Sequence, residues 1–181
     1  MKAIDTLLII FLSAMFCAAG CGYGTSSLLP AHIKKIHVEN FKNSIDIVNE
    51  APNAAIYKTY KPRLEQDITK AVIDKFIFDG NLKIAASDDA DAVLKADLID
   101  FKREALRYDE ADNVEQYRIV IEVNIELLDT KKNKTLWKFN NFFGSEEFYT
   151  SGSQAQSEAS AINEAVDDLA RRIVEQTIEV W

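Results

Sequence analysis

Histidine and the signature motifs of common enzymes are scarce in this sequence. Only two histidines occur, His32 and His37, and both lie near the start of the chain. Neither has a cysteine or carboxylate neighbour at the spacing of a metal site. The sequence also has no G-x-S-x-G, P-loop or H-E-x-x-H motif. Because catalysis needs converging chemical groups, we predict that the protein is not an enzyme and uses no metal or other cofactor.

Cysteine is equally rare, but the position of Cys21 is informative. It closes the stretch Ala18-Ala19-Gly20-Cys21, which follows the apolar run Leu7–Ala19 and a start that carries Lys2. A secretory signal has a positive start, an apolar middle and small residues at the cut. The apolar run is shorter than the roughly 20 residues that span a bilayer. The segment resembles a bacterial lipoprotein signal, so we expect cleavage before Cys21 and a covalent lipid on it.

Basic residues are too few to give the chain a positive charge. The sequence has 21 Lys and Arg against 29 Asp and Glu, which gives a net charge of −8. An acidic chain is a poor partner for nucleic acid or for an anionic membrane surface. Cys21 would be the only cysteine left after cleavage, so we expect no disulfide. Stability must then come from packing, and any anionic ligand must meet a local basic patch.

The length and composition of the chain predict one domain behind a tether. About 160 residues would remain after cleavage, which suits a single domain. The first of them are rich in glycine and small polar residues, which favour flexibility. We therefore predict a signal peptide over 1–20, a lipidated flexible tether over 21–32 and one domain over 33–181.

Hydrophobic periodicity predicts five strands and two helices. Apolar residues alternate most clearly over 117–127, and alternation also indicates strands at 33–41, 82–86, 92–108 and 136–143. Ile99 and Phe101 fall out of phase, which suggests a bulge or two covered faces. Apolar stripes predict one helix that Pro62 opens and Gly80 ends, and a second over 158–180. Residues 49–58 and 144–157 read as loops, and Asn133 suits a positive φ in a hairpin turn.

This order of elements predicts the class of fold. Helices with a single apolar stripe need a sheet face to cover. A strand–helix–strand start favours a parallel crossover, whereas the later, closely spaced strands should pair antiparallel. We predict a two-layer α+β sandwich, with two helices on one face of a mixed sheet of four to five strands. The predicted return strand should carry Trp137, Phe139 and Phe143 on one face.

Basic residues cluster at two places where an anion could bind. Three lysines lie in the predicted hairpin turn, and a second group lies late in the strand over 92–108. A phosphorylated glycolipid could dock on such groups through charge-assisted contacts. An ordinary solubilising turn explains the lysines equally well. The candidate residues are Lys131, Lys132 and Lys134 in the turn, and Lys102, Arg103 and Arg107 in the strand.

A series of short motifs resembles the LptE family, the lipopolysaccharide-assembly lipoproteins of Gram-negative outer membranes. Each motif is weak alone, but their order covers the chain from Cys21 to its end. A departure is Asn133, where the family pattern favours glycine, although asparagine tolerates the same backbone region. The motifs are Gly22-Tyr23, Leu29-Pro30, Ile36-x-Val38-x-x-Phe41-x-Asn43, Arg63-Leu64-Glu65, Asp79-Gly80, Ala90-Asp91-Ala92-Val93-Leu94, Tyr108-Asp109, Tyr117-Arg118, Asp129, Leu136-Trp137, Gly144, Tyr149 and Trp181.

This resemblance implies a non-enzymatic role at the outer membrane. Family members plug the lumen of a large β-barrel, LptD, assist its assembly and help it deliver lipopolysaccharide, which they are thought to bind, to the outer leaflet. Gly22 after the lipidated cysteine is compatible with outer-membrane sorting. Two alternatives remain open: an auxiliary lipoprotein of an envelope ABC-type phospholipid transport system, and an envelope enzyme. The expected partners are the barrel, lipopolysaccharide and, through the lipid, a membrane.

Overall fold

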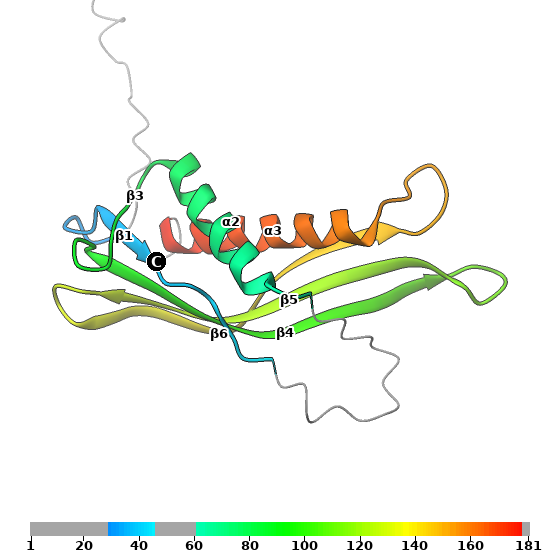
Figure 1. The fold of residues 1–181 in the computed structure, drawn as a ribbon, viewed down its shortest axis with the longest axis horizontal. Helices are drawn as coiled ribbons and strands as arrows, with labels where there is room; N and C mark the ends of the chain where they lie inside the picture. The colour runs from blue at the N-terminus through cyan, green and yellow to red at the C-terminus, as the bar shows by residue number, and fades with distance from the viewer. Residues whose placement is uncertain (1–28, 46–60, 179–181) are drawn as a thin grey trace, which may run out of the picture.

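The computed structural model describes residues 29–45 and 61–178 (Figure 1). The signal peptide, Cys21, the loop expected at 49–58 and the last three residues lie outside this part of the chain. The described elements, in chain order, are β1 (Lys35–Val38), β2 (Lys42–Asn43), α2 (Leu64–Asp79), β3 (Lys83–Ile84), β4 (Ala92–Tyr108), β5 (Val114–Asp129), β6 (Lys134–Tyr149) and α3 (Glu158–Ile178).

These elements form the predicted two-layer α+β sandwich. The strands lie in the order β3-β1-β4-β5-β6, and the two-residue β2 also pairs with β4. β1 runs parallel to β3 and β4, whereas β4, β5 and β6 pair antiparallel. The sheet is therefore mixed, as predicted. Figure 1 shows α2 and α3 together on one face of the long β4–β5–β6 ribbon.

β4 spans the predicted range and contains the expected bulge. Its register against β5 shifts between Leu98 and Asp100, so Ile99 is the extra residue. Beyond the bulge Phe101 faces the core, where its side chain is only 1% exposed. Because side chains alternate along a strand, one inserted residue restores an apolar side chain to the helix-covered face. The out-of-phase sequence pattern is thus explained by a bulge.

β6 differs from its prediction in length and in phase. It continues to Tyr149, so the loop expected from residue 144 begins six residues later. The polar residues of this extension still pair with β5, since an edge strand with one open face tolerates polar side chains. The register also shifts opposite Asn124, where Asn141 has a φ of +54°. This bulge pairs Phe142 with core-facing Val123 and moves Phe143 out of the phase of Trp137 and Phe139.

α2 begins two residues later than its sequence predicts. Pro62 lies in a turn, and Arg63 adopts a left-handed conformation with a φ of +71°. Helical geometry therefore cannot extend back through Arg63 to Pro62. The predicted end is confirmed: Gly80 has a φ of +77°, and its N–H donates to the carbonyl of Phe76 at 3.1 Å. Glycine takes up this conformation without a steric penalty.

The core lies between the two helices and the inner face of the sheet. α3 fits closely on β6 at Gly144, where a Cβ atom would lie 2.5 Å from the backbone nitrogen of Leu169. The core also includes Leu29 and Ile33, which are 6% and 5% exposed. Packing against the domain therefore begins within the segment expected to be a tether. α3 buries an apolar stripe that includes Ile162, Ala165, Val166, Leu169 and Ile173, and it begins at Glu158, where the second helix was predicted to begin.

Candidate functional site

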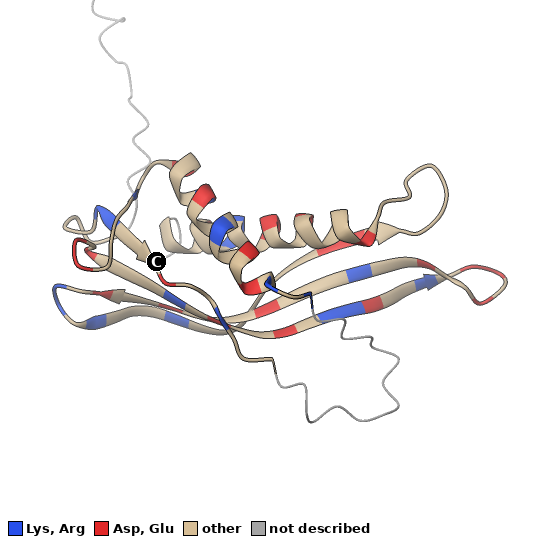
Figure 2. Ribbon diagram, in the orientation of Figure 1, with Lys and Arg blue, Asp and Glu red and all other residues tan. Residues whose placement is uncertain are grey.

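The predicted basic turn forms the end of the β5–β6 hairpin, which we call the hairpin tip (Lys131, Lys132 and Lys134). The β5–β6 turn lies at an end of the molecule and carries blue for Lys and Arg in Figure 2, and the positive φ predicted for Asn133 is present at +49°. Lys131 is already paired, because its Nζ lies 2.6 Å from Oδ1 of Asp91. Lys132 and Lys134 are exposed and form no ion pair within the described part of the chain. Two free ammonium groups therefore remain for an anion.

Two buried carboxylates hold the hairpin tip in place. Asp129 is fully buried, and its Oδ1 accepts the N–H groups of Lys131 and Lys132 at 3.0 Å. Its Oδ2 lies 2.7 Å from Nε2 of His32. Burial alone would raise the pKa of Asp129, but the hydrogen bonds from the Lys132 N–H and His32 outweigh it and hold that pKa below its usual value. The turn is thus fixed by the residue at which β5 ends.

Asp91, which directly precedes β4, also fixes the hairpin tip. Besides its contact with Lys131, its Oδ2 accepts the N–H groups of Lys34 and Lys35, both at 3.0 Å. These hydrogen bonds, first that from Lys131 and then that from Lys34, lower the pKa of Asp91 to about 2. The Thr130 hydroxyl donates to the Ala90 carbonyl at 2.7 Å. A network from three segments therefore presents the lysines on a rigid base.

The second basic group is not brought to the hairpin tip. Lys102 bridges Glu122 and Asp100, with its Nζ 2.6 Å and 2.9 Å from their carboxylate oxygens. The hydrogen bond to Glu122 raises the pKa of Lys102 against the opposing effect of burial. Arg103 pairs with Glu158 at 2.7 Å and stacks over the ring of Tyr117. These two side chains connect parts of the fold, so they are poor candidates for an anion site.

Arg107 lies still further from the hairpin tip. It is exposed near the β4–β5 turn, and the antiparallel register places that turn at the opposite end of the ribbon. The turn itself is acidic, since it contains Asp109, Glu110 and Asp112, and it is largely red in Figure 2. The structure therefore separates the two predicted basic clusters and leaves Lys132 and Lys134 as the candidate anion-binding pair.

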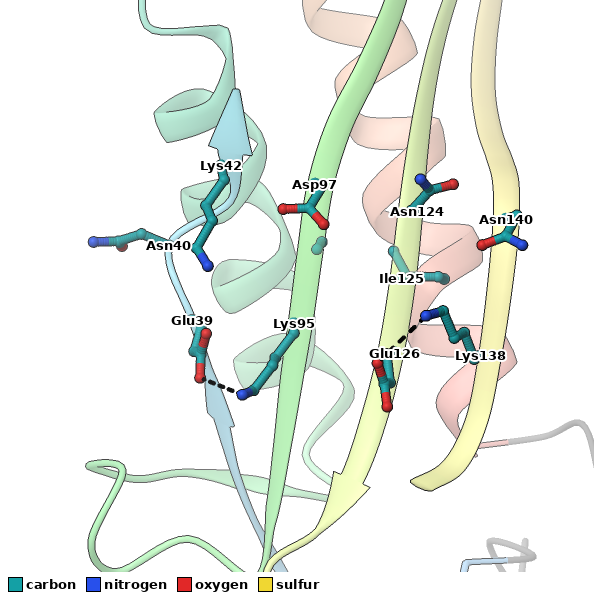
Figure 3. A pocket seen from close by; sticks show the side chains of 11 residues that line it. Glu39, Asn40, Lys42, Lys95, Asp97, Asn124, Ile125, Glu126, Lys138 and Asn140 are labelled. Atoms are coloured by element: carbon teal, nitrogen blue, oxygen red, sulfur yellow. Dashed lines mark ion pairs between the residues drawn. The ribbon is translucent and has the colours of Figure 1, made fainter. Parts of the chain in front are cut away.

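The outer face of the sheet carries a polar hollow that sequence patterns did not single out. Its volume is about 180 Å³, and it crosses β4, β5 and β6 (Figure 3). Lys95 pairs with Glu39 at 3.5 Å and Lys138 with Glu126 at 3.9 Å, while Asn124 lies further along β5, beside Asn140 of β6. Outward-facing polar residues of β5 were visible in the alternation of its sequence. Their grouping with β1 and β6 depends on strand order, which the sequence does not reveal.

Both histidines contact other described residues of the fold. His37 donates its Nδ1–H to the carbonyl of Ala85 at 3.0 Å, and His32 contacts Asp129. Within residues 29–45 and 61–178, no three His, Cys, Asp or Glu side chains come together as metal ligands. The described helices also include none that is long and apolar enough to cross a membrane.

Comparisons with known proteins connect this fold to a family. The sequence model of LptE, described as Lipopolysaccharide-assembly, matches residues 33–177. A search of curated proteins found no match. The fold is similar to that of protein XCC0632 from Xanthomonas campestris, with 14% identity, 80% of this chain and 83% of that chain covered, and a TM-score of 0.51. It is also similar to a PelC variant from Paraburkholderia phytofirmans, solved as a dodecamer, with 15% identity, coverages of 84% and 95%, and a TM-score of 0.50. At these identities the likeness concerns the fold.

Proposed function

Because the chain belongs to the LptE family of lipopolysaccharide-assembly proteins, we propose that it plugs a lipopolysaccharide-export β-barrel and assists its assembly. This is a non-enzymatic role for a lipoprotein of the outer membrane. In this proposal the protein sits in the lumen of an LptD-like barrel and helps to deliver lipopolysaccharide to the outer leaflet. The proposal goes beyond the family match in naming the barrel lumen, the lipid anchor and the glycolipid contact.

The polar outer face of the sheet is the observation that carries the proposal. The two helices cover the other face, so the outer face of β4, β5 and β6 is free to meet a partner (Figure 1). It presents Lys95, Asp97, Asn124, Glu126 and Lys138 around the hollow (Figure 3). The lumen of a large outer-membrane barrel is polar. A face of mixed charges and amides fits such a wall, whereas an apolar face would not.

A lipid on Cys21 would bring the domain to the barrel. Each buried CH₂ of an acyl chain contributes about 0.8 kcal/mol to membrane binding. Confinement near the membrane then raises the effective concentration of the domain at the barrel without adding a protein contact. Cys21 itself lies outside the described residues.

The hairpin tip is our candidate for the glycolipid contact. Lys132 and Lys134 project from a base that Asp129 and Asp91 hold in place. Ammonium groups form charge-assisted hydrogen bonds to phosphate. Because the chain is acidic overall, an anion must approach these residues at close range, where the screening length of about 8 Å removes most of the repulsion from distant carboxylates.

Co-purification from native membranes tests the barrel partner. We expect the tagged protein to bring down a large outer-membrane barrel after mild detergent extraction. Reversing the two lysines of the outer face, with Lys95→Glu and Lys138→Glu, should reduce the recovered barrel. The matched control reverses Lys70 and Arg171, which are exposed and ion-paired on α2 and α3, the helices that cover the other face.

The outcomes of this experiment separate the competing functions. Recovery of the tagged protein without a barrel would contradict the plug proposal. Equal recovery of the barrel with the two double variants would show that the outer face is not the surface that contacts the barrel. Recovery of inner-membrane transport components instead of a barrel would favour the auxiliary phospholipid-transport role. An enzymatic role would be revived if replacing His32 or His37 by alanine abolished an activity.

A further inference from the structure

The last turn of α2 exposes two large apolar side chains. Phe76 is fully buried, but the next two residues, Ile77 and Phe78, are 62% and 89% exposed. Successive side chains point about 100° apart around a helix, so the turn that buries Phe76 must direct Phe78 elsewhere. Among the large apolar residues described, none is more exposed than Phe78. Neighbouring exposed apolar side chains are typical of a contact surface.

This apolar pair lies at the end of the domain where the described chain begins. α2 ends at Asp79, and the N–H of Lys83 in β3 donates to the carbonyl of Lys34 at 2.9 Å. Figure 1 shows the C-terminal end of α2 at the same end of the molecule as β1 and β3. Leu29, the first described residue, is buried in the core. The apolar pair and the start of the chain are therefore neighbours in the fold.

The length of chain before Leu29 limits how far this end can lie from the lipid. Seven residues lie between Cys21 and Leu29, and the eight steps from one to the other span at most about 29 Å when fully extended. A lipid on Cys21 would thus hold this end of the domain close to the bilayer. We propose that Ile77 and Phe78 insert into the surface of the phospholipid leaflet in which the acyl chains attached to Cys21 are embedded. This inference rests on the proposed lipidation, but not on the barrel or on lipopolysaccharide.

The charges around the apolar pair favour a neutral lipid surface over an anionic one. Lys70 and Lys75 on α2 are balanced by Asp74 and Asp79. The contact should therefore depend on apolar burial and change little with salt, unlike a polybasic contact. A second contact point would also fix the direction of the long sheet relative to the membrane, which a flexible anchor alone cannot do. The outer face would then meet the barrel in one orientation.

Depth measurements on the lipidated protein test this contact. Phe78→Cys is labelled with an environment-sensitive fluorophore in the lipidated mature chain, in which lipid blocks Cys21. The protein is placed in phosphatidylcholine vesicles without barrel or lipopolysaccharide. Tyr108→Cys is the matched control, because Tyr108 is an aromatic residue that is 57% exposed at the far end of β4. We expect a blue-shifted emission and quenching by lipid-borne quenchers at position 78 only. Adding Ile77→Ser should reduce the quenching at least about twofold, because the remaining apolar side chain of the pair is then lost.

Each outcome decides the inference. A label at position 78 that remains as exposed to water as the label at 108 would overturn it. Two further results are quenching at position 78 that is seen only when a barrel is added, and quenching that is seen only when the protein self-associates. Either result would assign the apolar pair to a protein partner and overturn the membrane contact. Mass spectrometry of the same sample distinguishes the two proposals: a missing lipid overturns the anchor and this contact together, whereas a lipidated chain with an exposed label overturns the contact alone.

Discussion

Replacing Gly144 by alanine should strongly destabilise the domain. A Cβ atom at this position would lie 2.5 Å from both the Cβ and the backbone nitrogen of Leu169, and 2.6 Å from its Cα. Real contacts of this kind lie beyond 3 Å. Because two of the three obstructing atoms belong to the backbone of α3, no side-chain rotation removes the clash. The helix or β6 must shift by about 1 Å.

The size of the effect follows from what that shift disturbs. Overpacking a core costs about 1–3 kcal/mol, and more where the backbone must move. Leu169 and Ile173 on the same helix are fully buried. Lifting α3 would open gaps beneath them, and such gaps add a cavity cost to the strain. We therefore expect Gly144→Ala to lower the free energy of unfolding by about 3 kcal/mol or more.

Urea unfolding monitored by circular dichroism measures this loss, and Gly80→Ala is its control. At Gly80 no atom lies within 4 Å of an added Cβ, but the φ of +77° disfavours alanine. That substitution should cost about 1 kcal/mol through backbone conformation alone. A loss at Gly144 no larger than the loss at Gly80 would refute the close approach of α3 to β6. A changed slope of the transition would point instead to an altered unfolded state.

The remaining predictions concern the hairpin tip and the end of α2. Asp91→Asn should lower the free energy of unfolding by up to about 2 kcal/mol at pH 7, because the pKa of Asp91 is depressed to about 2 in the folded protein. In urea titrations, the difference in stability between the variant and the parent protein should shrink as the pH falls from about 4 towards 2. A difference that stays constant with pH would contradict the role of the Asp91 charge. Lys132→Glu with Lys134→Glu should weaken lipopolysaccharide binding, measured by titration at low salt, without changing the unfolding midpoint, whereas unchanged binding would remove the hairpin tip as the site. In urea unfolding, Phe76→Ala should lower the free energy of unfolding by about 3–5 kcal/mol, and Phe78→Ser should lower it by less than about 0.5 kcal/mol. Similar losses for the two variants would contradict the finding that Phe76 is buried and Phe78 exposed.

Local sequence patterns predict the elements that depend on neighbouring residues. β4 spans Ala92–Tyr108 as the alternation predicts, and Gly80 ends α2 because its backbone conformation excludes most other residues. Asn133 has its predicted positive φ for the same reason. In each case the deciding interaction lies within a few residues along the chain. Fold class follows as well, since the apolar stripes of two helices require one shared sheet face.

Features that depend on distant partners are not predictable in this way. Polar residues after Gly144 resemble a loop, yet β5 pairs with them through backbone groups that no side-chain pattern reveals. The contact between His32 and Asp129 joins residues 97 positions apart. The lysines of the hairpin tip were found from their spacing, but the capture of Lys131 by Asp91 depends on where β4 lies beside the turn. A charge pattern therefore locates basic groups without showing which of them are already paired.

The positions of these groups connect the proposed anchor to the proposed glycolipid contact. β1 pairs with the start of β4 at Ala92, and Ala92 in turn pairs with Asp129 at the end of β5. The hairpin tip, the first residues of the described chain and the end of α2 therefore share one end of the molecule (Figure 1). A lipid on Cys21 would keep Lys132 and Lys134 near the membrane, while the acidic β4–β5 turn at the other end would point away. The ribbon is long compared with the screening length of about 8 Å, because its strands β4 and β5 have 17 and 16 residues at about 3.3 Å each. The acidic turn at the far end therefore has little effect on an anion at the hairpin tip. Placing both contacts at one end in this way lets an acidic protein present two ammonium groups where an anionic lipid can reach them.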